Sequence, residues 1–213
     1  MKFKSALIAA WCAVLFLSIG RMVLVADVEK ADEVRQPHTP TLIFFLTGVE
    51  SQQDADSIRA SVQKLKSATT LDVNTNRSYA CIRFDSHVVS YHQVAQAIAE
   101  AGKTLGKSYD PYLIFSVLEY GRSNNAAKVD AIFAGKRLNT RVNVKPLDKN
   151  KGEFSVHFLP LKVDPNETTP QGFNGGHLHH PISDPPPQGL GLTSTYVANA
   201  DYHLREDPAK VTH

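Results

Sequence analysis

The sequence predicts an α+β protein, and three observations carry the prediction. Short segments rich in β-branched and aromatic residues, at 41–48, 70–74 and 78–85, have the composition of strands. Apolar residues recur at helical spacing in 54–65 and 90–102. The same order of strand, helix, strand and strand returns about 70 residues later, in 111–163.

The first strand and helix follow directly from these patterns. Residues 41–48, TLIFFLTG, end at a glycine and are predicted to form a strand. In 54–65 the side chains of Ile58, Val62 and Leu65 fall on one stripe of a helix. Ser51 or Asp54 is expected to cap the start of that helix, since both side chains accept hydrogen bonds from free backbone N–H groups.

A hairpin and a second helix complete the predicted unit. Residues 70–74 and 78–85 are predicted to pair across a turn, and a last strand is expected within 103–109. The second helix begins at the cap Ser90 and stops at Gly102. The second hairpin strand alternates, with Ala80, Ile82 and Phe84 on one side and Tyr79, Cys81 and Arg83 on the other. The order strand, helix, strand, strand, helix, strand predicts a ferredoxin-like βαββαβ sandwich with both helices on one face.

The residues of this unit also resemble a known family, the heavy-metal-associated domain. The residues that carry the resemblance are Gly48, Val49, Ser51, Asp54, Ile58, Val62, Leu65, Leu71, Val73, Phe84, Asp85, Val89, Ser90, Val94, Ile98 and Gly102. That family opens its first helix with Gly-Met-x-Cys-x-x-Cys, whereas this chain has GVESQQD in the same frame. The resemblance implies the family's scaffold, but Ser51 and Asp54 stand where its two metal-binding thiols would be.

This replacement argues against the family's metal chemistry. Monovalent copper prefers thiolates, while hydroxyl and carboxylate oxygens suit hard cations. Ser51 is therefore interpreted as a helix cap and Asp54 as an acidic side chain at the positive end of the helix. Two alternatives remain open: a weak oxygen site at Ser51 and Asp54, and a single-thiol site at Cys81.

Residues 111–163 predict a second, degenerate copy of the same unit. Its helix is expected at 124–138, and the preceding loop EYGRSNNA holds neither cysteine nor histidine. Where a second helix should follow, prolines and glycines in 166–191 predict a loop or extended segment instead. We therefore predict tandem domains at 41–109 and 111–204, with a C-terminal tail at 205–213. Because the strands are apolar on both sides, the two copies are expected to bury their open sheet faces against each other or against another protein.

Histidines are the remaining candidates for chemistry. His177, His179 and His180 lie in this Pro/Gly-rich loop, and His203 follows later. Converging imidazoles bind zinc or divalent copper, which makes the first three a candidate metal site, although exposed polar residues are the alternative. His87 and His92 are expected to be exposed, and His157 is expected to point away from the core.

The N-terminus predicts export. Residues 1–26 combine Lys2 and Lys4 with an uncharged stretch, which is typical of a signal peptide; an uncleaved membrane anchor is the alternative. Residues 27–40 are predicted to be a tether. Without the signal the chain holds one cysteine, Cys81, so no internal disulfide is expected. The predicted location is the periplasm, the cell envelope or the outside of the cell.

These features predict an exported, non-catalytic binding or interaction module with a protein partner in the cell envelope. The formal charge of +2 gives no reason to expect nucleic-acid binding, and membrane contact is expected only through an uncleaved 1–26. The alternative is a zinc- or copper-binding protein that uses the three histidines. No enzyme motif is recognised, neither a G-x-S-x-G elbow nor a phosphate-binding glycine loop.

Overall fold

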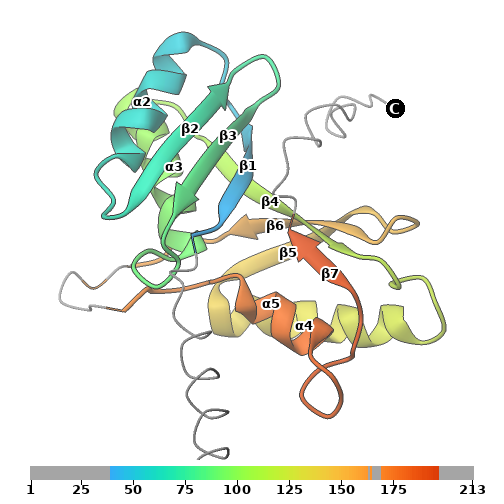
Figure 1. The fold of residues 1–213 in the computed structure, drawn as a ribbon. Helices are drawn as coiled ribbons and strands as arrows, with labels where there is room; N and C mark the ends of the chain where they lie inside the picture. The colour runs from blue at the N-terminus through green and yellow to red at the C-terminus, as the bar shows by residue number, and fades with distance from the viewer. Residues whose placement is uncertain (1–38, 163, 165–168, 197–213) are drawn as a thin grey trace, which may run out of the picture. The chain divides into compact units, whose positions relative to one another are not determined.

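The first half of the protein has the predicted order of elements. A computed structural model describes residues 39–162, 164 and 169–196. The predictions for 1–26, for most of the tether, for His203 and for the tail 205–213 lie outside these residues. The described chain begins with β1 (Thr41–Thr47), α2 (Gln52–Val62), β2 (Ala68–Asn74), β3 (Tyr79–Phe84), α3 (Tyr91–Thr104) and β4 (Asp110–Val117). The strands pair antiparallel in the order β2-β3-β1-β4, which is the ferredoxin-like arrangement (Figure 1).

The second half repeats this arrangement with a shorter last helix and strand. After β4 come α4 (Asn125–Thr140), β5 (Val142–Asp148), β6 (Glu153–Phe158), α5 (Gly176–Ser183) and β7 (Ser194–Tyr196). β5 pairs with β6, β6 with β4, and β4 with β7, again antiparallel. The described residues therefore form an α+β fold with one seven-stranded sheet.

β4 belongs to both halves. Asp110 and Tyr112, near its start, pair with β1, while Phe115 to Val117 at its end pair with β7. The prediction of a separate strand within 103–109 is wrong, because α3 runs to Thr104 and a turn follows it, in which the N–H groups of Leu105 and Lys107 both donate to the carbonyl of Gly102. The division into tandem domains at 41–109 and 111–204 stays a prediction. In the sheet the two halves share one strand, β4.

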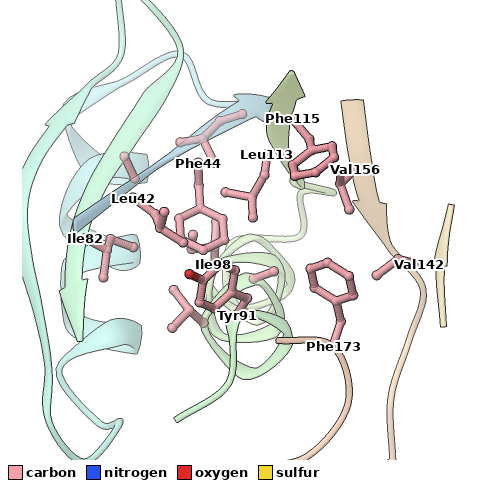
Figure 2. Packing of buried hydrophobic residues seen from close by; sticks show 14 of the residues in the cluster. Leu42, Phe44, Ile82, Tyr91, Ile98, Leu113, Phe115, Val142, Val156 and Phe173 are labelled. Atoms are coloured by element: carbon pink, nitrogen blue, oxygen red, sulfur yellow. The ribbon is translucent and has the colours of Figure 1, made fainter. Parts of the chain in front are cut away.

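One core serves both halves. Apolar residues of all four helices in the described chain join the helix-facing side chains of both halves in a single buried cluster. Figure 2 shows Phe44, Leu113, Tyr91 and Phe173 among the side chains of this interior. The expectation that the copies bury their open sheet faces against each other is wrong, because they join edge to edge through β4 and turn the same face toward the helices.

The opposite face of the sheet carries a second, smaller apolar cluster. It contains Ile43, Phe45, Tyr79, Tyr112 and Ile114, all of them buried. β1 is therefore buried on both sides, as its apolar alternation predicts. β3 alternates as predicted too, with Ala80, Ile82 and Phe84 in the main core.

α5 lies where an extended segment was expected. Prolines do exclude a long helix, but eight residues form a short one that includes Pro181. The segment that follows turns back onto this helix, and the N–H groups of Leu190 and Leu192 bind the carbonyls of Pro181 and Ile182. These contacts, with Leu178 and Ile182 buried in the core, stabilise a helix whose local sequence disfavours it.

Within the described residues, none of the helices combines the length and the apolar character needed to span a bilayer.

Candidate functional site

The loop between β1 and α2 contains Ser51 and Asp54, the two residues predicted to stand where the heavy-metal-associated domain has its thiols. Gly48 turns the chain here with a φ of +82°, and a Cβ on it would lie 2.5 Å from the carbonyl oxygen of Ser108. Ser51 is the N-cap of α2, as predicted, and its hydroxyl accepts a hydrogen bond from the N–H of Asp54. Asp54 binds back to the N–H of Ser51, which completes a capping box.

Asp54 does more than complete this cap. Its side chain is fully buried and accepts hydrogen bonds from four donors. Two are the backbone N–H groups of Glu50 and Ser51, both at 2.9 Å. The others are the ammonium group of Lys107 at 2.8 Å and the hydroxyl of Tyr109 at 2.6 Å. The buried carboxylate is thus fully paired, as a buried charge must be.

These donors keep the Asp54 carboxyl group ionised. Burial alone would raise the pKa of Asp54, but the hydrogen bonds from Lys107, Tyr109 and the two backbone groups outweigh it and hold the pKa far below its ordinary value. Burial, and next the hydrogen bond to Asp54, raise the pKa of Tyr109 well above its ordinary value. Both oxygens of Asp54 are engaged by protein donors, so the predicted oxygen site has no free ligand from this side chain.

Cys81 is a poor metal ligand in this setting. It lies on β3 toward the second apolar cluster and is partly buried. Burial, and next the negative charge of Asp72, raise the pKa of the Cys81 thiol. Because the thiolate is the form that binds metals, this environment disfavours the predicted single-thiol site.

The three histidines of the predicted metal site point to different partners. His177 is tied through its Nδ1 to the backbone of Asn174, His179 contacts the hydroxyl of Ser194 at 3.1 Å, and His180 contacts Asp184 at 3.2 Å. Their helical backbone spreads them around α5, whereas an extended chain would have placed His177 and His179 on one side. Within the described residues, no three His, Cys, Asp or Glu side chains are grouped so that they could hold a metal ion.

Three side chains on the sheet are hydrogen-bonded in the order Asp, His, Ser, which is the order of a serine hydrolase triad. His157 contacts Asp110 through Nδ1 and Ser155 through Nε2, both at 3.0 Å. The sequence gives no sign of this arrangement, because Asp110 comes from another strand. Ser155, however, is only 2% exposed and lies within paired strands on both sides, where the backbone N–H groups are used by the sheet. Ser155 is therefore not accessible as a nucleophile in this arrangement.

His92 is buried, which overturns the expectation that it is exposed. Its Nε2 lies 2.8 Å from the carbonyl oxygen of Leu159, and its Nδ1 accepts a hydrogen bond from the N–H of Phe173. Burial lowers the pKa of His92, although the hydrogen bond to Leu159 opposes this effect. His92 therefore joins α3 of the first half to two segments of the second half, a role that its place beside a helix cap does not reveal.

Comparison with known proteins adds the following. No protein family and no curated protein sequence matches the chain. One similar solved structure is the water-soluble region of the P-type ATPase CopA from Bacillus subtilis, which is 17% identical over 59% of this chain and 80% of that chain, with a TM-score of 0.33. Another is the N-terminal soluble domains of Bacillus subtilis CopA, 17% identical over 62% and 85% of the two chains, with a TM-score of 0.30. The fold assignment rests on the strand order described above.

Proposed function

We propose that the protein is an exported, non-catalytic binding module, built from two ferredoxin-like repeats of the heavy-metal-associated type that have lost the metal site. The observation that carries the proposal is the state of Asp54. A side chain at the position of the family's second thiol is buried and saturated by four protein donors. The loop thus holds the scaffold together where it would otherwise hold an ion.

The absence of catalysis is proposed on chemical grounds. Among the described residues the arrangement that most resembles catalytic machinery is the chain of Asp110, His157 and Ser155. Its serine is buried in the middle of a paired strand, so a substrate carbonyl has no approach to it. The geometry supports a structural role, in which His157 links β4 and β6 across the sheet.

The alternative function, zinc or copper binding through His177, His179 and His180, receives no support from their placement. His177 is half-buried beside Phe173, with ring centroids 5.7 Å apart, and its Nδ1 is engaged by the backbone. We therefore retain the interaction module as the proposal.

The test is a metal titration in which the backbone amide signals of the loop between β1 and α2 are measured. Silver(I), a stable substitute for copper(I), is added to the isotope-labelled full chain while backbone amide signals are followed. A Cys81→Ser variant, titrated in parallel, removes the one thiol on the described part of the chain as a competing ligand. Zinc is added in a separate titration to the wild type and to a variant with His177, His179 and His180 changed to Asn.

The proposal predicts that the amides of residues 48–55 do not respond to silver(I) in the Cys81→Ser variant. It also predicts that zinc binds no more tightly to the wild type than to the triple histidine variant. A stoichiometric ion that shifts the amides of Ser51 and Asp54 would contradict the loss of the metal site. Sequencing the N-terminus of the protein from its own host tests export, and a mature chain that begins near Asp27 is expected.

A further inference from the structure

A hollow of about 530 Å³ opens beside the start of α5, and nothing in the proposed function uses it. We call it the α5 hollow. Its wall is formed by the beginning of β1, the loop before α3, the start of α5 and β7, so both halves contribute to it. The residues of the lining that matter here are Tyr91, Gly175, Gly176, His87, His179 and His180. Its volume is within the range of sites that bind small molecules.

Tyr91 brings an unused hydrogen-bond donor to this hollow. The residue is only 5% exposed, and its ring packs edge-on against Phe84, Phe173 and Tyr196. Its hydroxyl forms no hydrogen bond within the described part of the chain, and burial alone accounts for the rise of the Tyr91 pKa to about 12. Buried tyrosine hydroxyls usually have a partner. The Tyr91 oxygen is not among the fully buried unpaired atoms of the described residues, so it opens onto the hollow that Tyr91 lines, and its partner is expected there.

The start of α5 lies against the same hydroxyl. A Cβ at Gly175 would be 2.6 Å from the Tyr91 oxygen, so only glycine allows the backbone to approach this closely. α5 has no side-chain cap, and the N–H of Gly176 has no partner among the described residues. Asn174 accepts hydrogen bonds from the neighbouring N–H groups of Gly175 and His177, which leaves the N–H of Gly176 as the donor that faces the hollow. A free N–H at the positive end of a helix attracts anions.

The rest of the lining also suits an anion. None of the lining residues is Asp or Glu, whereas His87, His179 and His180 contribute imidazoles at the rim. All three rings are held through Nδ1, His180 by Asp184, His179 by Ser194 and His87 by Asp85. In the described part of the chain none of the three rings forms a hydrogen bond through Nε2, and an N–H at that position can donate to an oxyanion.

We infer that the α5 hollow binds a small oxyanion, a phosphate or carboxylate group, which accepts hydrogen bonds from the Tyr91 hydroxyl and the Gly176 N–H. The ligand would complete the cap of α5 and supply the partner that Tyr91 lacks. This inference names a ligand class for a binding module, but it depends on residues of α3 and α5 and on none that contact Asp54. If no anion binds in the α5 hollow, the proposal that the loop before α2 has lost its metal site still stands. If a metal binds at Ser51 and Asp54, the proposal for the α5 hollow still stands.

The experiment uses the amide of Gly176 as the reporter. The ¹⁵N-labelled full chain is titrated with inorganic phosphate and, separately, with acetate, against sodium chloride at matched ionic strength. We expect a saturable shift of the Gly176 and His177 amides with one or both anions and none with chloride. Saturation by phosphate alone identifies a phosphate-bearing ligand, and saturation by acetate alone identifies a carboxylate.

Tyr91→Phe is the decisive variant, because it removes the hydroxyl and keeps the ring that packs in the core. Loss of a hydrogen bond to a charged group is expected to weaken anion binding about tenfold. Tyr120→Phe is the matched control, since the Tyr120 hydroxyl contacts Asp130 on α4 and its loss should leave binding unchanged. The inference is overturned if neither anion shifts the Gly176 amide, or if Tyr91→Phe binds the anion as tightly as the wild type.

Discussion

A single buried histidine links the two halves of the molecule and makes stability depend on pH. His92 is held neutral by burial, which lowers its pKa below the ordinary value of 6.5. In the unfolded chain the ring takes up a proton as the pH falls below about 6.5. Protonation therefore favours the unfolded state, and the stability that is present above pH 6.5 is lost as the pH decreases. His177, whose pKa burial also lowers, contributes in the same direction.

We predict that His92→Gln shows a smaller loss of stability between pH 7 and pH 5.5 than the wild type. The amide of Gln can still donate to the Leu159 carbonyl but takes up no proton. Because the variant loses the ring nitrogen that accepts from the Phe173 N–H, it is expected to be less stable by about 1 to 3 kcal/mol at pH 7. Urea unfolding at the two pH values measures both effects. An equal pH-dependent loss in the two proteins would show that His92 is not a source of it.

At the scale of residues, local contacts are predictable from the sequence and distant ones are not. Ser51 and Ser90 were both expected as helix caps, and each forms a capping box with the residue three positions later. The burial of Asp54 depends on Lys107 and Tyr109, which approach it only after the sheet has formed. No pattern near Asp54 indicates this, because its role in the cap already accounts for the local sequence.

At the scale of elements, the segment that leads into α5 is anchored by Phe173. This side chain is fully buried, and its ring contacts Tyr91 of α3 and Phe158 of β6. We predict that Phe173→Ala lowers the free energy of unfolding by about 4 kcal/mol, because it leaves a large cavity between the two halves. Leu118→Ala is the control: Leu118 is 65% exposed, and its loss should change stability by less than about 0.5 kcal/mol. Similar small effects in both variants would refute the anchoring role.

The elements that the sequence misplaces are those that long-range contacts decide. β1, α2, β2, β3, α3 and α4 lie close to their predicted ranges because hydrophobic period and caps define them. Periodicity cannot show that one strand serves two units, so a second strand was expected before β4. α5 was missed for the opposite reason, since its prolines and glycines disfavour a helix locally and only packing on the core restores it.

At the scale of the whole molecule, the shared strand predicts cooperative unfolding. β4 cannot leave one half without breaking the sheet of the other, and a single core spans both. We predict one calorimetric transition for the described fold, with calorimetric and van't Hoff enthalpies that agree. Two separate transitions would mean that the halves are independent domains, as flexibly linked tandem repeats would be.

The scaffold of this molecule does not determine its chemistry. The fold follows from the strand order, but the same fold serves many functions, and only the site residues decide among them. Here the site residues are engaged in holding the structure together. Asp54 is therefore central: its buried, fully paired carboxylate stabilises the loop between β1 and α2.

The most direct test compares the unfolding free energy of Asp54→Asn with that of the wild type at pH 7 and at acid pH. Asn presents an amide to donors that require a carboxylate, so we predict a loss of about 3 kcal/mol at pH 7. The pKa of Asp54 is depressed in the folded state, so its contribution to stability is present above about pH 4 and is lost as the pH falls further. The difference in unfolding free energy between the wild type and Asp54→Asn should therefore shrink as the pH falls below about 4. Asp56→Asn, on the exposed side of the same helix, should change stability by less than about 0.5 kcal/mol. An Asp54→Asn variant as stable as the wild type at pH 7 would contradict the account.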